Sequence, residues 1–86
     1  LLRSLPVSTV KIDRSLIEPL PAADASAVVK AICQLAAVLQ LDVVAEGVET
    51  EAQAHAAREA GCQVLQGALY AVPLTADEAG AWLARA

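Results

Sequence analysis

Apolar, strand-like segments alternate three times with segments of helical pattern, and this alternation constrains the fold of the 86-residue chain more than any other feature. Apolar runs occur at residues 7–13, 41–45 and 62–66, and helical patterns occur at 24–40, 50–61 and from Thr75 onward. Strands joined by helix-length crossovers pair in parallel through right-handed connections. Runs that are apolar along most of their length are typical of strands covered on both faces. The order therefore predicts an α/β fold, β-α-β-α-β-α, with parallel strands.

The helical segments carry their own start and stop signals. Thr50 and Gln53 form a predicted capping box, and Gly61 is placed to end that helix. Thr75 and Glu78 form a second predicted capping box. In the helix that Thr75 opens, one apolar face is expected from Ala79, Trp82 and Leu83.

The segment 24–40 is expected to bury one apolar stripe. Its apolar residues recur mostly at spacings of three and four, as on one helical face, at Val28, Ile32, Leu35, Ala36 and Leu39. Asp24 is the expected N-cap of this helix. The two prolines just before it predict a connecting loop.

A sheet of only three parallel strands would leave both of its edges open, and exposed edges favour association. The composition also favours an incomplete core, because 57% of the residues are apolar but only 2% are aromatic. A chain of this length buries a modest core at best. We therefore expect residues 1–86 to be one piece of a larger closed (β/α)8 barrel, with no second domain. Such a piece is expected to associate with itself or with the missing barrel half.

Charge and cysteine content exclude several classes of partner. The formal net charge is −4 without a basic cluster, which argues against a nucleic acid polymer or an anionic membrane surface. No apolar run reaches the roughly 20 residues that span a bilayer. The chain is therefore expected to be cytoplasmic without direct membrane contact, within a parent that is free or membrane-tethered. Cys33 and Cys62 lack CxxC spacing and are expected to be reduced, buried thiols, with a disulfide or a metal pair as the alternative.

Polar residues gather where the predicted strands end. Lys11 and Asp13 end the first strand, Glu46 and Glu49 follow the second, and Gln66 ends the third. In a (β/α)8 barrel, functional groups project from the carboxyl ends of the strands. The sequence therefore predicts that these side chains share one face of the barrel.

Most of these residues also have a simple structural interpretation. Lys11 and Asp13, two residues apart on one strand face, are placed to form a mutual ion pair or a solvated turn. Glu49 is placed to interact with a helix N-terminus. Glu46 differs, because a carboxylate directly after an apolar run is partly desolvated and needs a cation, a metal or a raised pKa. Gly47 would let a backbone or a ligand approach it closely.

Three motifs carry a resemblance to a known family. The stretches LPVSTVKIDRSLI (5–17), VVAEGVETEAQ (43–53) and VLQGALYAVPL (64–74) resemble successive motifs of the EAL domain, the bacterial phosphodiesterase of cyclic di-GMP. Their order and spacing match the family, and the similarity covers essentially the whole chain. The resemblance implies that this chain is the C-terminal part of an EAL domain, equivalent to the last three βα units of its TIM-like (β/α)8 barrel.

The resemblance also implies an activity and roles for the strand-end residues. The family uses Mg²⁺ or Mn²⁺, commonly in a two-metal site, to hydrolyse one phosphodiester bond of cyclic di-GMP and give linear pGpG. By this resemblance Lys11 would be catalytic, holding and polarising the attacking water, and Glu46 would be a catalytic metal ligand. Asp13 and Glu49 would support the site and its loops, and Gln66 would help to position it.

The sequence departs from the family pattern in two respects. The Glu-Ala-Leu signature, the Asn and Glu ligands of the middle strands and the paired aspartates of the DDFG-type motif are absent, so the isolated chain is expected to be inactive. Ala68 occupies a position that is often aromatic in the family, and Val72 one that is often polar or basic. Both residues favour an alternative, in which the parent is a degenerate EAL domain that senses cyclic di-GMP or binds a protein partner.

Overall fold

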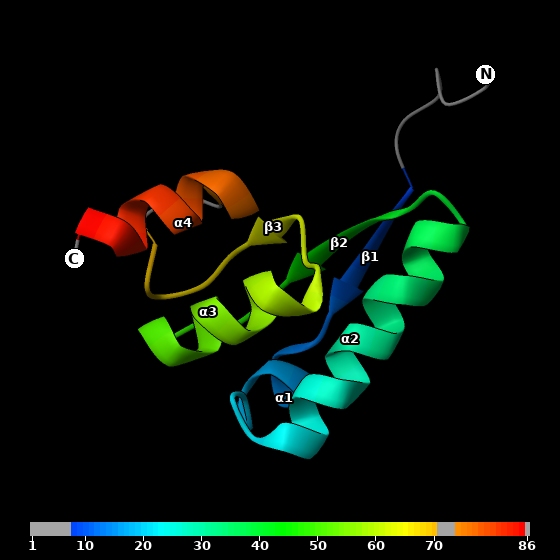
Figure 1. The fold of residues 1–86 in the computed structure, drawn as a ribbon, viewed down its shortest axis with the longest axis horizontal. Helices are drawn as coiled ribbons and strands as arrows, with labels where there is room; N and C mark the ends of the chain where they lie inside the picture. Colours follow the sequence, from blue (N-terminus) through cyan, green and yellow to red (C-terminus); the bar gives the residue numbers. More distant parts are fainter. Residues whose placement is uncertain (1–7, 71–73, 86) are drawn as a thin grey trace.

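The computed structural model describes residues 8–70 and 74–85, with side chains up to residue 81 (Figure 1). The elements are, in chain order, β1 (Thr9–Ile12), α1 (Arg14–Ile17), α2 (Ala23–Val38), β2 (Asp42–Ala45), α3 (Glu51–Ala60), β3 (Val64–Leu65), β4 (Leu74–Thr75) and α4 (Ala76–Arg85). Figure 1 shows α2, α3 and α4 following one another in the order of the strands, and α3 packs against both of the others. The alternation of strands and helices was therefore predicted correctly.

The first three strands of the sheet are parallel, as predicted, and the strand order is β1-β2-β3-β4. Lys11 pairs with Val44 of β2, and Ala45 of β2 pairs with Leu65 of β3. Such pairing brings the carboxyl ends of the three strands to one edge of the sheet. Of the third predicted strand, only the two residues of β3 form.

The strand β4 corrects the prediction of a wholly parallel sheet. Leu74 and Thr75 pair antiparallel with β3, and the backbone N–H of Ala76 donates to the carbonyl of Gln63 at 2.7 Å. An edge strand offers unpaired backbone groups to any segment that returns beside it. The edge of β3 is covered in this way by the chain itself, whereas in the described part of the sheet β1 has β2 as its only neighbour.

The helix α2 buries a face that only partly overlaps the predicted one, because Ala36 of the predicted set is buried and Ile32 is partly buried against the core. Val28, Leu35 and Leu39 are 47%, 62% and 58% exposed, whereas the buried side chains of this helix are Val29, Cys33 and Ala36. Both sets repeat at spacings of three and four, so periodicity alone does not choose between them. The helix therefore has two apolar stripes, and only one of them lies on the core.

The start of α2 and the short helix α1 also differ from expectation. The N-cap of α2 is Ala22, without a side-chain cap, so the prediction for Asp24 was wrong. Asp24 lies in the first turn, where its carboxylate faces the positive end of the helix dipole and accepts a hydrogen bond from the N–H of Ala25 at 3.0 Å. The helix α1 is too short for periodicity to reveal, and it buries Ile17 completely.

Both predicted capping boxes are confirmed. At α3, the Thr50 side chain accepts from the N–H of Gln53 at 3.1 Å, and the Gln53 side chain accepts from the N–H of Thr50 at 3.2 Å. At α4, Thr75 and Glu78 exchange the same pair of bonds at 3.0 and 3.1 Å. Gly61 ends α3 in the left-handed region, with φ +115°. Ala79 of the expected α4 face is buried, while the side chains of Trp82 and Leu83 lie outside the described residues.

The core consists of small and medium apolar side chains contributed by the strands and the inner faces of the helices. Its largest fully buried members are Ile12, Ile17, Leu65, Val29, Val43, Val48 and Cys62. Cys33 and Cys62 are buried free thiols with their Sγ atoms 3.7 Å apart, between α2 and the end of α3. No helix in the described ranges combines the length and the apolar character that a membrane crossing requires.

Candidate functional site at the carboxyl ends of the strands

Lys11 and Glu46 meet across the carboxyl ends of β1 and β2. The Nζ atom of Lys11 lies 3.9 Å from Oε2 of Glu46, and the two side chains are 66% and 32% exposed. At this distance and exposure the pair adds little to stability. Its significance is geometric, because a cation and a carboxylate from adjacent parallel strands point to one place. The half-buried state of Glu46 agrees with the prediction of partial desolvation, and its partner is a cation.

Asp13 is a helix cap and makes no ion pair with Lys11. Its carboxylate accepts a hydrogen bond from the backbone N–H of Ser15 at 2.9 Å. This bond, together with one to the side chain of Ser15, lowers the pKa of Asp13 below its ordinary value of 3.8. The simple interpretation of Lys11 and Asp13 as an ion pair was therefore wrong, because Asp13 turns to the N-terminus of α1.

The loop that carries Glu46 is fixed on both sides by the neighbouring strands. The N–H of Glu46 donates to the carbonyl of Ile12 at 3.1 Å, and the N–H of Val48 donates to the carbonyl of Gln66 at 3.0 Å. The carbonyl of Val48 in turn accepts from the N–H of Leu69 at 3.1 Å. The segments that follow the three parallel strands are thus joined by backbone hydrogen bonds, which hold Glu46 and Gln66 at neighbouring strand ends.

Two glycines allow these segments to lie so close together. Gly47 has φ +80°, and a Cβ there would stand 2.6 Å from Cγ of Arg14. Gly67 has φ +155°, and a Cβ there would stand 2.3 Å from the backbone N and O of Val48. L side chains rarely adopt either conformation. The expected close approach at Gly47 is made by the Arg14 side chain, which sequence reasoning did not identify.

The remaining predicted residues contribute unequally. Gln66 is half-buried, and its N–H donates to the carbonyl of Ala45 at 2.9 Å. Glu49 is exposed, and its backbone N–H donates to Oε1 of Gln53 at 2.8 Å. Among the described residues, the Glu49 carboxylate forms no ion pair. Lys11 and Glu46 are therefore the two predicted side chains that the structure brings into contact.

The described residues do not form a metal site on their own. No group of three or more His, Cys, Asp or Glu side chains within them could hold a metal ion. Mg²⁺ requires close to six oxygen ligands in near-octahedral geometry, some of them waters. Glu46 fits such an ion as a single carboxylate ligand, and the other protein ligands would have to come from outside the described residues.

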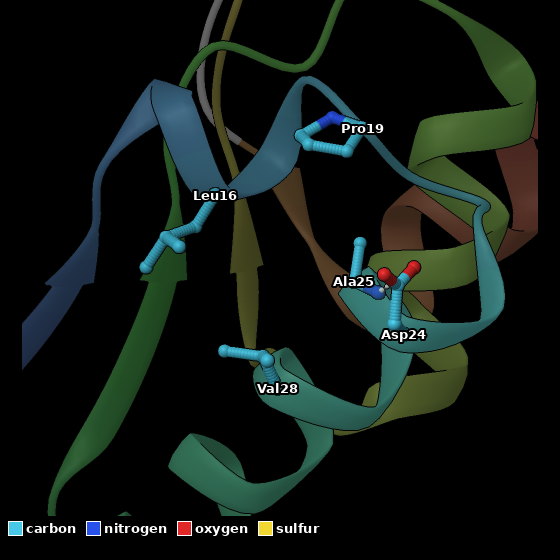
Figure 2. Close-up of a pocket in the computed structure, with 5 residues that line it drawn as sticks. All are labelled: Leu16, Pro19, Asp24, Ala25 and Val28. Carbon is cyan, nitrogen blue, oxygen red and sulfur yellow. Dashed lines mark hydrogen bonds between the residues drawn. The ribbon is translucent and has the colours of Figure 1, made fainter.

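An apolar cavity of about 230 Å³ lies away from the strand ends, between α1 and the start of α2 (Figure 2). Its walls are the side chains of Leu16, Pro19, Asp24, Ala25 and Val28. Figure 2 shows Leu16 and Val28 facing a common space from the two helices. None of the predicted site residues lines this cavity, and its walls offer a single charged group.

Comparison with known families assigns the chain that carries this site to a family. The family model described as the EAL domain matches residues 1–73, which contain every predicted site residue. The chain belongs to the EAL domain family. The resemblance carried by the three sequence motifs is thereby confirmed.

Relatives of this EAL chain include enzymes of cyclic di-GMP metabolism. The bifunctional diguanylate cyclase/cyclic di-GMP phosphodiesterase MucR of Pseudomonas aeruginosa is 46% identical over 78 residues, which are 90% of this chain but 11% of MucR. A solved MucR phosphodiesterase in complex with c-di-GMP superimposes with a TM-score of 0.70 and 47% identity, over 85% of this chain and 33% of that one. The EAL domain of Mycobacterium smegmatis DcpA has a TM-score of 0.70 and 40% identity, over 96% of this chain and 38% of that one.

These neighbours confirm the predicted fold class. EAL domains are TIM-barrel-like, and this EAL chain has the parallel βα units of such a barrel, with the short β4 added at the edge of β3. The chain spans about a tenth of the MucR sequence and between a third and two fifths of the solved EAL chains. The chain therefore corresponds to one sector of an EAL barrel.

Proposed function

We propose that this EAL chain supplies the last three βα units of a barrel that hydrolyses one phosphodiester bond of cyclic di-GMP and releases linear pGpG. The observation that carries the proposal is the approach of Lys11 Nζ to Glu46 Oε2, 3.9 Å apart at the carboxyl ends of adjacent strands. In TIM-like barrels this is the edge where catalytic groups gather. The activity that gives MucR its name adds support, because the match to MucR covers 90% of this chain.

Each residue of the site has a role that suits its position. The Nζ group of Lys11 donates hydrogen bonds to the attacking water, which orients the water and stabilises its developing negative charge. Glu46 would hold Mg²⁺ or Mn²⁺ through one carboxylate oxygen. The ion would supply a lowered pKa for water and neutralise charge on the phosphoryl group. Gln66 and Glu49 support the site from the adjoining loops, and Asp13 does so by capping α1 directly after β1.

The open surfaces of the chain support the need for the rest of the barrel. The outer edge of β1 has no strand beside it within the described residues, and the outward stripe of α2 exposes Val28, Leu35, Val38 and Leu39. A contiguous apolar surface on a soluble protein marks an interaction site. We propose that the preceding βα units cover this surface, with self-association as the alternative, and that the isolated chain is inactive. The complete protein is proposed to act in the cytoplasm, free or tethered to the membrane.

The proposal is tested by assaying the complete protein that contains this chain. Cyclic di-GMP and pGpG are separated by chromatography after incubation with Mg²⁺ or Mn²⁺. We expect Lys11→Met and Glu46→Gln each to lower kcat by about a hundredfold or more. Ser8→Ala, at an exposed position before β1, is the control and should leave turnover unchanged. A complete protein that binds metal and cyclic di-GMP but releases no pGpG would contradict the enzymatic proposal.

A second candidate function is a sensor that binds cyclic di-GMP or a protein partner without cleavage. Ala68, an exposed residue directly after Gly67, motivates it, because this position departs from the aromatic residue that the family resemblance predicts and so indicates a degenerate site. Val72 lies outside the described residues. Calorimetry on the complete protein distinguishes the two functions. A stable binding isotherm with intact ligand supports the sensor, and heat that continues as ligand is consumed supports the enzyme.

A further inference from the structure

Gln53 links the segments that follow β1 and β2. Among the residues described with side chains it is the only buried one with an amide or charged side chain, at 6% exposure. Its Oε1 accepts hydrogen bonds from the N–H groups of Glu49 and Thr50, at 2.8 and 3.2 Å. Its Nε2 donates to the carbonyl of Glu18 at 3.1 Å, across 35 positions of sequence. The amide NH₂ group of Gln53 therefore bonds to a different part of the fold from its amide oxygen.

The partners of this amide belong to the two segments that carry the candidate site. Glu18 is the C-cap of α1, the helix that Asp13 opens directly after β1. Glu49 lies in the loop between β2 and α3, which carries Glu46. The Gln53 amide thus joins the loop after β2 to the far end of the segment after β1. The strand ends themselves are joined by the bond from the N–H of Glu46 to the carbonyl of Ile12.

The capping box of α3 does not explain why this residue is glutamine. A capping box needs only an acceptor at this position, and glutamate serves as well. The chain contains that comparison, because Glu78 closes the equivalent box at α4 with Thr75. A carboxylate at position 53 would still accept from the Glu49 and Thr50 N–H groups, but it could not donate to the Glu18 carbonyl. The amide is therefore required by the link and not by the helix cap.

We propose that Gln53 is a positioning residue of this site. By holding the β2–α3 loop against the end of α1, it keeps Glu46 in range of Lys11 and sets the spacing of the two site segments. Its effect on turnover rests on the proposed phosphodiesterase function, whereas its effect on the geometry does not.

The test exchanges the two capping boxes in the complete protein. Gln53→Glu keeps the cap of α3 and removes the donor, and Glu78→Gln makes the reciprocal change at α4. The second position is a suitable control, because α4 begins beside Gln63, at the opposite end of β3 from Gln66. We expect Gln53→Glu to lower kcat about tenfold, a loss typical of residues that orient a ligating side chain without contacting the metal. The KM for cyclic di-GMP should stay within about twofold. Glu78→Gln should leave both constants unchanged.

A second readout does not need catalysis. In isotope-labelled protein, Gln53→Glu should shift the amide resonances of Lys11 and Glu46 while the Glu49 amide stays protected from hydrogen exchange. Glu78→Gln should shift none of them. If the wild-type protein releases no pGpG but these shifts occur, the proposed function fails and the positioning role holds. Unshifted resonances, or a kcat for Gln53→Glu equal to that of Glu78→Gln, would overturn the positioning role.

Discussion

Gly67 lies against the backbone of Val48 so closely that a Cβ on Gly67 would stand 2.3 Å from both N and O of that residue. Real Cβ atoms do not approach backbone atoms so closely, so a side chain at position 67 would push apart the loops that follow β2 and β3. Since Val48 donates to the carbonyl of Gln66 within this contact, the approach also fixes the relative positions of Glu46 and Gln66.

Replacing Gly67 should therefore cost both stability and activity. We expect Gly67→Ala to lower the free energy of unfolding by about 3 kcal/mol, because it adds strain at a positive φ to a clash with backbone. Urea denaturation measures the loss. The control is Gly80→Ala, where the new Cβ would meet the flexible guanidinium of Arg58 at 2.8 Å.

At Gly80 two effects of similar size oppose each other. Alanine gains about 1 kcal/mol of helix propensity over glycine. Displacing Arg58 loses its hydrogen bond to the Ala76 carbonyl, which is also worth about 1 kcal/mol. Equal stability losses for Gly67→Ala and Gly80→Ala would show that the contact with Val48 is not tight.

The two thiols should react slowly in the folded protein. Burial raises the pKa of both Cys33 and Cys62 above the ordinary value of 9.0, and a neighbouring sulfur adds to the effect at Cys62. The thiolate is the reactive form, so alkylation by iodoacetamide at about pH 8 should be much slower than in denaturant. Mass spectrometry follows the reaction. Rapid modification under native conditions would show that these cysteines are exposed or ionised.

The same thiols should make stability fall in alkali. A group whose pKa is raised in the folded state stabilises the fold below its unfolded pKa, and this stabilisation is lost as pH rises toward the folded value. We expect the melting temperature of wild-type protein to fall above about pH 9 more steeply than that of Cys62→Ala. Parallel pH profiles for the two proteins would be the contrary result.

Asp13 should make stability depend on acid in the opposite direction. Its pKa is lowered by hydrogen bonds from Ser15, so its contribution is present above 3.8 and is lost as pH falls through the folded-state value. Asparagine also caps helices but does not titrate. The melting temperature of wild type should therefore exceed that of Asp13→Asn by more at about pH 7 than at about pH 2. A gap that does not change with pH would mean that the charge of Asp13 is unimportant to the cap.

The outward stripe of α2, formed by Val28, Leu35, Val38 and Leu39, should determine whether the chain associates with itself or with the rest of the barrel. Leu35 is 62% exposed in this chain, so Leu35→Lys should change its stability by less than about 0.5 kcal/mol. Sedimentation of the chain should shift toward monomer, and the complete protein should lose about 2 kcal/mol or more, because a charge would enter a covered surface. The control is Ala36→Lys, which should destabilise both forms because Ala36 is buried. An unchanged complete protein would show that nothing covers the stripe.

Much of the fold follows from local sequence signals, and the differences have a common physical cause. Helix periodicity and the boxes at Thr50 and Thr75 act within a few residues, so the repeating units were predictable. Which stripe of α2 is buried depends on its position over the sheet, which is a tertiary property. The strand β4 forms by pairing with β3, and no periodicity marks a two-residue strand.

The candidate site was also predictable only in those features that depend on local sequence order. The clustering of polar residues at strand ends was visible in the order of the chain. The partner of Lys11 was not, because it depends on the register between β1 and β2, which places Glu46 near it, and on the capping bond that turns Asp13 toward α1. The link from Gln53 to Glu18 spans distant parts of the chain, and sequence spacing revealed only the capping half of that residue's contacts.

The double apolar character of α2 limits how such barrels can exchange parts during evolution. One stripe is matched to the chain's own core, and the other presents Leu35 and Leu39 to whatever lies beside it. A recombination joint placed before β1 would preserve every motif in this chain. Under the proposal that preceding βα units cover the second stripe, such a joint would yield a stable hybrid only where the incoming helix offers a surface complementary to that stripe. Under that proposal, the contact between neighbouring helices would have to be inherited together with the βα repeat.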